Sequence, residues 1–260
     1  MRPLLAGWSS AVVAVVVPVA ILVCPRLAAA QPQPQTVTPA GSPRAVASRA
    51  RLRNASDGEV SLERRAEQRL ESAQRLLFDG RYADAVTAFD IVLDQPDVRG
   101  VDTLTSWASH GMALAEALNG HLTHARSLYA SVLRLPAASP VAAAADSIEA
   151  AVLTEQHGAA AALLDRFAEG HRSALAQQYV HSFRGLDLAL DGKCTNAVAE
   201  VGRAPDAERP IPQAVRGLCA ARAGHHEQAL ALRDSVLTHP LADPMSWPMI
   251  VARGVAMRIK

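Results

Sequence analysis

The sequence predicts an all-α protein: an α-solenoid of about five helix-turn-helix units followed by a C-terminal helix. Hydrophobic residues make up 50% of the 260 residues but aromatic residues only 4%, so the core has to be built from small and aliphatic side chains, as in closely packed helices. From about residue 61, apolar residues recur at i+3 and i+4, which is the period of an amphipathic helix. Glycine-containing turns also recur, at Gly80, Gly120, Gly158, Gly192 and Gly224.

The first thirty residues have the layout of a secretory signal peptide. Arg2 is followed by an apolar run over residues 11–24 and by three alanines at 28–30. We expect cleavage after Ala30 and a periplasmic or otherwise exported protein. The alternative is an uncleaved anchor in the inner membrane with the repeats outside, because residues 4–24 approach the roughly 20 apolar residues of a membrane-spanning helix.

Residues 31–60 form the next segment, and their composition predicts a disordered linker. The segment is rich in Pro, Gln and Arg and has no periodic apolar face. The repeat domain is predicted to follow, over residues 61–260. We expect helices at 62–78, 82–94, 103–118, 122–134, 140–156, 159–169, 173–190, 194–203, 211–223, 226–238 and 245–259.

Four of the five predicted hairpins carry a small residue five positions after their glycine, where the two helices approach closely. These residues are Ala85, Ala125, Ala197 and Ala229. The third unit has Leu163 at this position, so we expect its helix pairing to be shifted by one residue. One hairpin cannot bury both of its apolar stripes, so the units have to stack on each other.

This arrangement resembles the tetratricopeptide repeat (TPR) family. The first unit matches the family pattern with Gly80, Tyr82, Ala85, Phe89 and Pro96, the second with Gly120, Ala125, Tyr129 and Pro136, and the fifth with Gly224, Ala229 and Pro240. The fifth unit has Arg233 where an aromatic is usual, and the fourth is degenerate. The signal layout and the high use of Ala and Arg indicate an exported bacterial member.

The resemblance implies a concave face that binds extended peptides through residues of the first helix of each unit. The corresponding positions are Leu70, Gln74, Leu77, Trp107, His110, Leu114, Ile148, Val152, Tyr179, Ser182 and Leu186. Trp107 and Tyr179 are the best candidate anchors, since large amphipathic rings dominate many interfaces. Ordinary packing within the repeats is the alternative for each residue. The set lacks the Lys, Asn and Arg clamp with which some members hold a chaperone's C-terminal carboxylate.

No catalytic or metal-binding motif is present in the sequence. The pair His226-Glu227 lacks the second histidine of a zinc peptidase motif, and we expect His121, His124, His225 and His226 to be solvated turn residues. With 26 Lys+Arg against 25 Asp+Glu, the chain has no basic surface for nucleic acid. We therefore expect no cofactor and no metal, and a non-catalytic scaffold or adaptor for protein or peptide partners in the bacterial cell envelope. The alternatives are an inner-membrane-anchored regulatory protein with extracytoplasmic repeats, or an enzyme with an unrecognised site.

Two further features concern the C-terminal part of the chain. Cys194 and Cys219 can form a disulfide in an oxidising compartment, or they can be two buried thiols. The last predicted helix is apolar all round, which leaves one face without a predicted partner. We expect it to dock onto a partner, a second copy or a membrane through Trp247, Ile250, Val251 and Val255. The alternative is that it folds back onto the end of the repeats.

Overall fold

The computed structural model describes residues 64–95, 98, 102–135, 139–239 and 247–260, and all regular structure in these ranges is α-helical. The all-α prediction is therefore confirmed. The predictions for the signal peptide at 1–30, for the linker at 31–60 and for the repeat-ending prolines Pro96, Pro136 and Pro240 lie outside the described residues.

The helices follow the predicted ranges to within a few residues. A first helix covers residues 64–78. It is followed by α2 (Tyr82–Leu93), α3 (Asp102–Leu118), α4 (Leu122–Val132), α5 (Pro140–Leu153), α6 (His157–Gly170), α7 (Ala174–Leu190), α8 (Cys194–Val201), α9 (Pro210–Arg222), α10 (His226–Thr238) and α11 (Trp247–Ala256).

Local chemistry explains several helix starts. The hydroxyl of Ser139 accepts the Ala142 N–H at the start of α5, and the hydroxyl of Ser173 accepts the Ala176 N–H at the start of α7. Pro140 and Pro210 occupy the first positions of α5 and α9, where the missing N–H costs no hydrogen bond.

The helices pair into hairpins that are closed by one recurring turn. The turn residue is in the left-handed region at Gly80, Gly120, Gly192 and Gly224, and the same conformation occurs at Glu155, with φ of 57°. In every one of these turns, the next residue donates its N–H to a carbonyl five residues earlier; the bonds are Arg81 to Leu76, His121 to Glu116, Gln156 to Ala151, Lys193 to Leu188 and His225 to Ala220. This bond terminates the first helix of each hairpin, as in a Schellman motif.

The third hairpin corrects the register predicted from the sequence. Gly158 lies inside α6 and does not form the turn, which is made by Glu155. The residue five positions after Glu155 is Ala160, so Ala160 and not Leu163 is the close-packing residue of this hairpin. The turn therefore lies three residues earlier than Gly158, whereas the sequence predicted a shift of one residue. The alanines that follow the five turns by this spacing (Ala85, Ala125, Ala160, Ala197 and Ala229) all have 0% exposure.

We predict that Glu155→Gly stabilises the protein. A side chain in the left-handed conformation costs roughly 1–2 kcal/mol, and glycine avoids most of that cost, so we expect a gain of about 1 kcal/mol. The matched control is Gly192→Ala at the same position of another turn, where a Cβ meets no atom within 4 Å and only the backbone conformation opposes it. It should lower the unfolding free energy by about 1 kcal/mol. Urea unfolding measures both; a loss of stability in Glu155→Gly would contradict the turn assignment.

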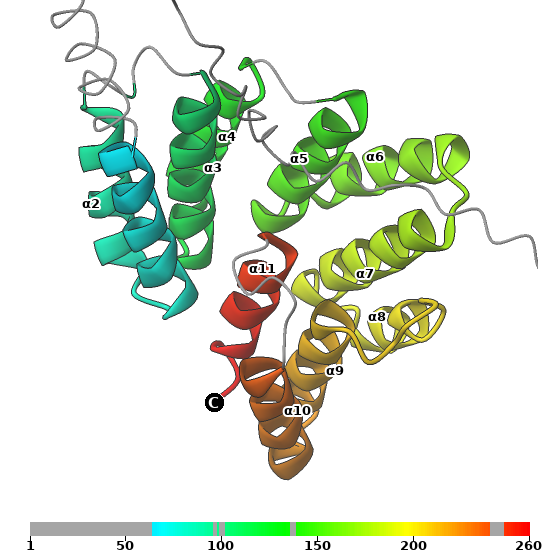
Figure 1. The fold of residues 1–260 in the computed structure, drawn as a ribbon. Coiled ribbons are helices and arrows are strands. Elements are labelled where there is room, and N and C mark those ends of the chain that lie inside the picture. Colours follow the sequence, from blue (N-terminus) through cyan, green and yellow to red (C-terminus); the bar gives the residue numbers. More distant parts are fainter. Residues whose placement is uncertain (1–63, 96–97, 99–101, 136–138, 240–246) are drawn as a thin grey trace, which may run out of the picture. The chain divides into compact units, whose positions relative to one another are not determined.

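The first helices of successive hairpins also contact each other. α3 packs against α5, α5 against α7 and α7 against α9 (Figure 1). Among the second helices, α4, α8 and α10 pack mainly against their own hairpin partners, whereas α6 packs about equally against its partner α5 and against α7 of the next hairpin. The buried side chains form one large cluster that runs through these helices, from Ala66 to Ala256.

The C-terminal helix departs from the expected stack, in which a helix touches only its neighbours in sequence. α11 contacts α3 as well as α9 and α10, and it lies between α3 on one side and α9 with α10 on the other (Figure 1). Its apolar residues are buried on all sides: Met249, Ile250, Val251, Ala252 and Val255 are all 2% exposed or less. The helix is apolar all round because other helices of the same chain surround it.

Long polar side chains tie α11 to segments far away in the sequence. Arg253 donates to the carbonyls of Phe78 (3.2 Å) and Leu237 (2.7 Å), and its guanidinium lies 3.9 Å from the centre of the Phe78 ring. Arg258 donates to the Ala117 and Leu118 carbonyls at the end of α3. The first hairpin and the last are therefore connected through this helix.

Small residues allow α11 to approach its neighbours, and this generates a second prediction. A Cβ on Gly254 would lie 2.5 Å from Leu118 Cδ2, so Gly254→Ala overpacks the α3–α11 contact and should cost about 1–3 kcal/mol. The control, Gly158→Ala in α6, meets no atom within 4 Å and should be neutral or slightly stabilising. Thermal unfolding of both variants checks this, and equal melting temperatures would mean that α11 is not packed as described.

Candidate functional site

Most residues of the predicted peptide groove are in the core. Leu70, Gln74, Leu77, His110, Leu114, Ile148, Val152, Ser182 and Leu186 are all buried. Packing between the helices covers them, and α11 lies against the inner helices α3 and α9, so they do not line an open groove. The two predicted anchors differ from the rest: Trp107 is 52% exposed, and Tyr179 is half-buried beside a pocket.

The predicted docking surface on the last helix is also inside the protein. Ile250, Val251 and Val255 are buried, and the half-buried Trp247 stacks on His110 of α3 with ring centres 4.7 Å apart. A partner, a second copy or a membrane cannot reach these aliphatic side chains while α11 is in place. The prediction of a free apolar face on this helix is therefore wrong.

A buried polar cluster lies beneath Trp247. His110 Nε2 is 2.8 Å from Glu149 Oε1 on α5, and the Tyr129 hydroxyl of α4 donates to the same oxygen at 3.0 Å. His110 Nδ1 lies 3.8 Å from Asp146 Oδ1. The carboxylate of Glu149 thus joins three neighbouring helices, α3, α4 and α5. Both His110 and Glu149 are buried, with 5% exposure each.

The charges in this cluster determine its proton affinities. Burial opposes protonation of His110, but the charge of Glu149, its hydrogen bond and the charge of Asp146 outweigh burial and raise the pKa of His110 above 6.5. Burial, together with Glu149, raises the pKa of Tyr129 well above 10.0, so its hydroxyl stays protonated and can donate. His110, Tyr129 and Glu149 are buried, whereas the Asp146 side chain is partly exposed.

The four turn histidines expected to be solvated are exposed, and two of them also pair with a carboxylate. His121 and His124 both lie close to buried Glu116, with Nδ1 to carboxylate distances of 2.6 and 3.1 Å. His157 pairs in the same way with Asp187 of the next hairpin, at 2.7 Å. These histidines hold the ends of helices together, and His225 and His226 are exposed as predicted.

The structure offers no metal centre or membrane span in the residues it describes. No three His, Cys, Asp or Glu side chains among them come together as metal ligands would. None of the helices in these ranges is both long and apolar enough to cross a membrane.

The two cysteines are joined. Cys194 at the start of α8 and Cys219 in α9 form a disulfide with Cα atoms 5.3 Å apart. The bridge connects the fourth hairpin to the fifth. Of the two possibilities left open by the sequence, the structure contains the disulfide.

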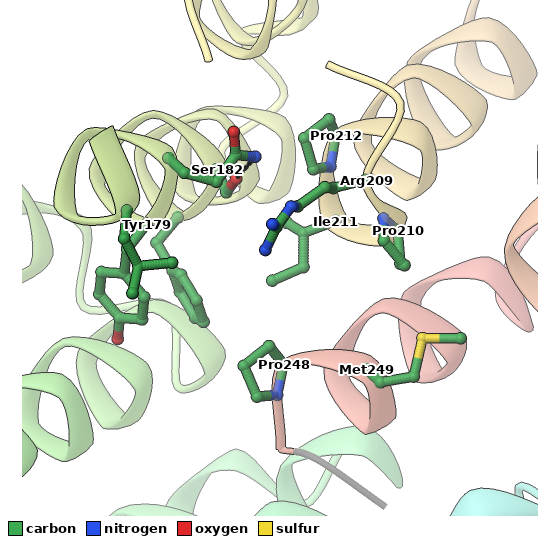
Figure 2. Close-up of a pocket in the computed structure, with 11 residues that line it drawn as sticks. Tyr179, Ser182, Arg209, Pro210, Ile211, Pro212, Pro248 and Met249 are labelled. Carbon is green, nitrogen blue, oxygen red and sulfur yellow. Dashed lines mark hydrogen bonds between the residues drawn. The ribbon is translucent and has the colours of Figure 1, made fainter. Parts of the chain in front are cut away.

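A pocket of about 370 Å³ opens between α7, α9 and the start of α11 (Figure 2). Its walls include Tyr179 and Phe183 of α7, Ile211 of α9 and Met249 of α11. The rings of Tyr179 and Phe183 stack with centres 4.5 Å apart. The Tyr179 hydroxyl donates to the Ala145 carbonyl of α5, so its proton is not available to a ligand and the ring contributes apolar surface to the pocket.

The polar side chains around this pocket have different roles. Gln178 accepts the Asp206 N–H (2.8 Å) and donates to the Asp206 carbonyl (2.9 Å) and to the Ser182 hydroxyl (3.2 Å). Gln178 therefore holds the loop before α9 in place and has little hydrogen-bonding capacity left. Arg209, the residue just before α9, extends across the opening toward α7 (Figure 2). Among the lining residues that the structure describes, it is the one with a charge.

Five exposed large apolar side chains lie toward the hairpin ends that are opposite the tight turns. Ile91 and Leu133 lie at the ends of second helices, and Trp107, Val141 and Leu175 lie in the first two turns of first helices. Because the tight turns join the two helices of each hairpin antiparallel, these positions all lie at the edge opposite the turns. We call these five residues the open edge. Sequence reasoning found only Trp107, because exposure depends on how neighbouring hairpins stack.

No protein-family model, curated protein or solved structure matches this chain. Its function has to be argued from its own residues.

The raised pKa of His110 predicts how stability depends on pH. A raised pKa means that the folded state holds the proton on His110 more tightly than the unfolded state does, which stabilises the fold. This stabilisation is complete below pH 6.5 and is lost as the pH rises through the folded-state pKa of His110. His110→Gln can still donate to Glu149 but cannot titrate. Its melting temperature should therefore lie furthest below that of wild type at low pH, with the difference shrinking as the pH rises above 6.5.

The control for this experiment is His226→Gln, which changes an exposed histidine on α10. It should follow the wild-type profile throughout. A difference between wild type and His110→Gln that stays constant with pH would show that His110 does not hold an extra proton in the folded protein.

Proposed function

We propose that this chain is a non-catalytic, TPR-like α-solenoid that acts as a protein–protein interaction scaffold in the bacterial cell envelope. The C-terminal helix α11 covers part of the inner side, against α3 and α9, so partner proteins bind through the open edge. This assignment replaces the open groove expected from the sequence with a surface that remains accessible.

The repeated hairpin supports the TPR-like part of the proposal. Five turns share one backbone conformation, one hydrogen-bonding pattern and a fully buried alanine at the same spacing. The contacts of α3 with α5, of α5 with α7 and of α7 with α9 are those expected when such units stack.

The disulfide supports the exported location. Disulfides persist in oxidising compartments such as the periplasm and are rare in the bacterial cytosol. Cys194 and Cys219 are paired across two adjacent hairpins, as is common in exported proteins.

The open edge is the observation that carries the scaffold function. Trp107 is 52% exposed and Leu175 is 67% exposed, although most residues of this size on a folded chain are covered. Their helices are neighbours or next neighbours in the stack, so one protein surface can cover several of these side chains together. Exposed apolar side chains that include a tryptophan are typical of interaction sites.

Site-specific photocrosslinking in the native cell envelope tests the proposal. A photoreactive phenylalanine analogue at Trp107 or at Val141 should form one defined adduct with a partner protein. The double variant Trp107→Ser with Val141→Ser should then recover at least tenfold less of that partner, because an interface anchor of this size contributes about 2 kcal/mol.

The control places the same photoreactive residue at Val198, which is exposed on α8 but does not belong to the open edge. Circular dichroism verifies that the variants fold. The proposal is wrong if Val198 gives the same adduct as the edge positions, or if the folded double variant recovers the partner as well as wild type.

A further inference from the structure

We infer that the pocket between α7, α9 and α11 binds a small amphiphilic monocarboxylate, with its apolar body inside and its carboxylate on Arg209. This goes beyond the proposed scaffold function. It concerns a small molecule in a cavity and not a protein on the open edge.

The size and walls of the pocket fit an apolar body. Its volume of about 370 Å³ lies at the lower end of the roughly 300–1,000 Å³ of small-molecule sites. The stacked rings of Tyr179 and Phe183 line the pocket, together with Ile211, Pro248 and Met249. Figure 2 shows Tyr179 facing Ile211 and Pro248 across it. The polar atoms of Gln178 and Ser182 bond to each other and to the loop at Asp206, so they do not require a polar ligand.

Arg209 supplies a single cationic contact at the opening. Its Nε donates to Asp206 Oδ2 at 3.4 Å, a long and exposed contact. Its two terminal nitrogens have no partner among the residues that the structure describes. A guanidinium with free terminal nitrogens forms two parallel hydrogen bonds to a carboxylate.

The surrounding charges favour a monoanion. Asp206 already offsets part of the charge on Arg209, and the nearby Glu208 accepts hydrogen bonds from Gln213 (3.1 Å) and Arg216 (3.5 Å). A dianionic phosphate would bring a second negative charge with no further cation in the pocket lining. A carboxylate matches the one guanidinium that is available.

Isothermal titration of the full-length protein with decanoate, below the concentration at which it forms micelles, tests this inference. We expect saturable binding with one site per chain. Decanol lacks the charge and decyl phosphate carries two, so both should bind more weakly. Arg209→Gln should weaken decanoate binding about tenfold and leave decanol binding unchanged.

The matched control is Arg216→Gln on the same helix, which removes an arginine that does not line the pocket. It should bind decanoate like wild type. Leu175→Trp, at the exposed rim, should block the pocket and abolish binding of decanoate and decanol together.

Several outcomes would overturn the inference: no saturable decanoate binding, equal loss in Arg209→Gln and Arg216→Gln, or decyl phosphate binding as tightly as decanoate. None of them affects the scaffold proposal, whose test uses Trp107 and Val141 outside this pocket. A lost photocrosslink with intact decanoate binding would reject the scaffold function alone.

Discussion

The described fold depends on the burial of one helix by helices from both ends of the repeat region. α11 is apolar on every face and contacts α3, α9 and α10 at once. Without it, the inner sides of these helices would face solvent, and the hairpins would be held together only by contacts between neighbours. Because Arg253 and Arg258 also satisfy carbonyls at the ends of other helices, α11 contributes hydrogen bonds as well as apolar contacts.

Local features of the fold were readable from the sequence, and its long-range contacts were not. The helices and four of the five turns follow from apolar periodicity and from glycine, whose preference for the left-handed conformation is a property of a single residue. The third turn was misplaced because Glu155 adopts that conformation without being glycine, and the nearby Gly158 drew the prediction away from it. The position of α11 was missed because a helix that is apolar all round can be either a core helix or an unpaired one, and periodicity does not separate the two.

The candidate site shows the same limit. Ile148 and Leu186, which were expected to line a groove, are fully buried on α5 and α7, and their burial depends on how neighbouring hairpins pack, which no local pattern reveals. The pair of His157 with Asp187 spans thirty residues and joins two hairpins, so no local motif could reveal it. Trp107 was identified because its chemistry is unusual for a helix surface. Arg209 was not, since a single arginine before a helix is common and only the fold places it over an apolar pocket.

The order of α11 along the chain affects how the protein is made. This helix follows every other described helix, so a ribosome releases the hairpins before the segment that fills the space between them. Until that segment emerges, the nascent polypeptide presents aliphatic surface that chaperones and proteases recognise. A premature stop codon shortly before Trp247 would leave every hairpin intact in sequence, and the product would still be a substrate for degradation.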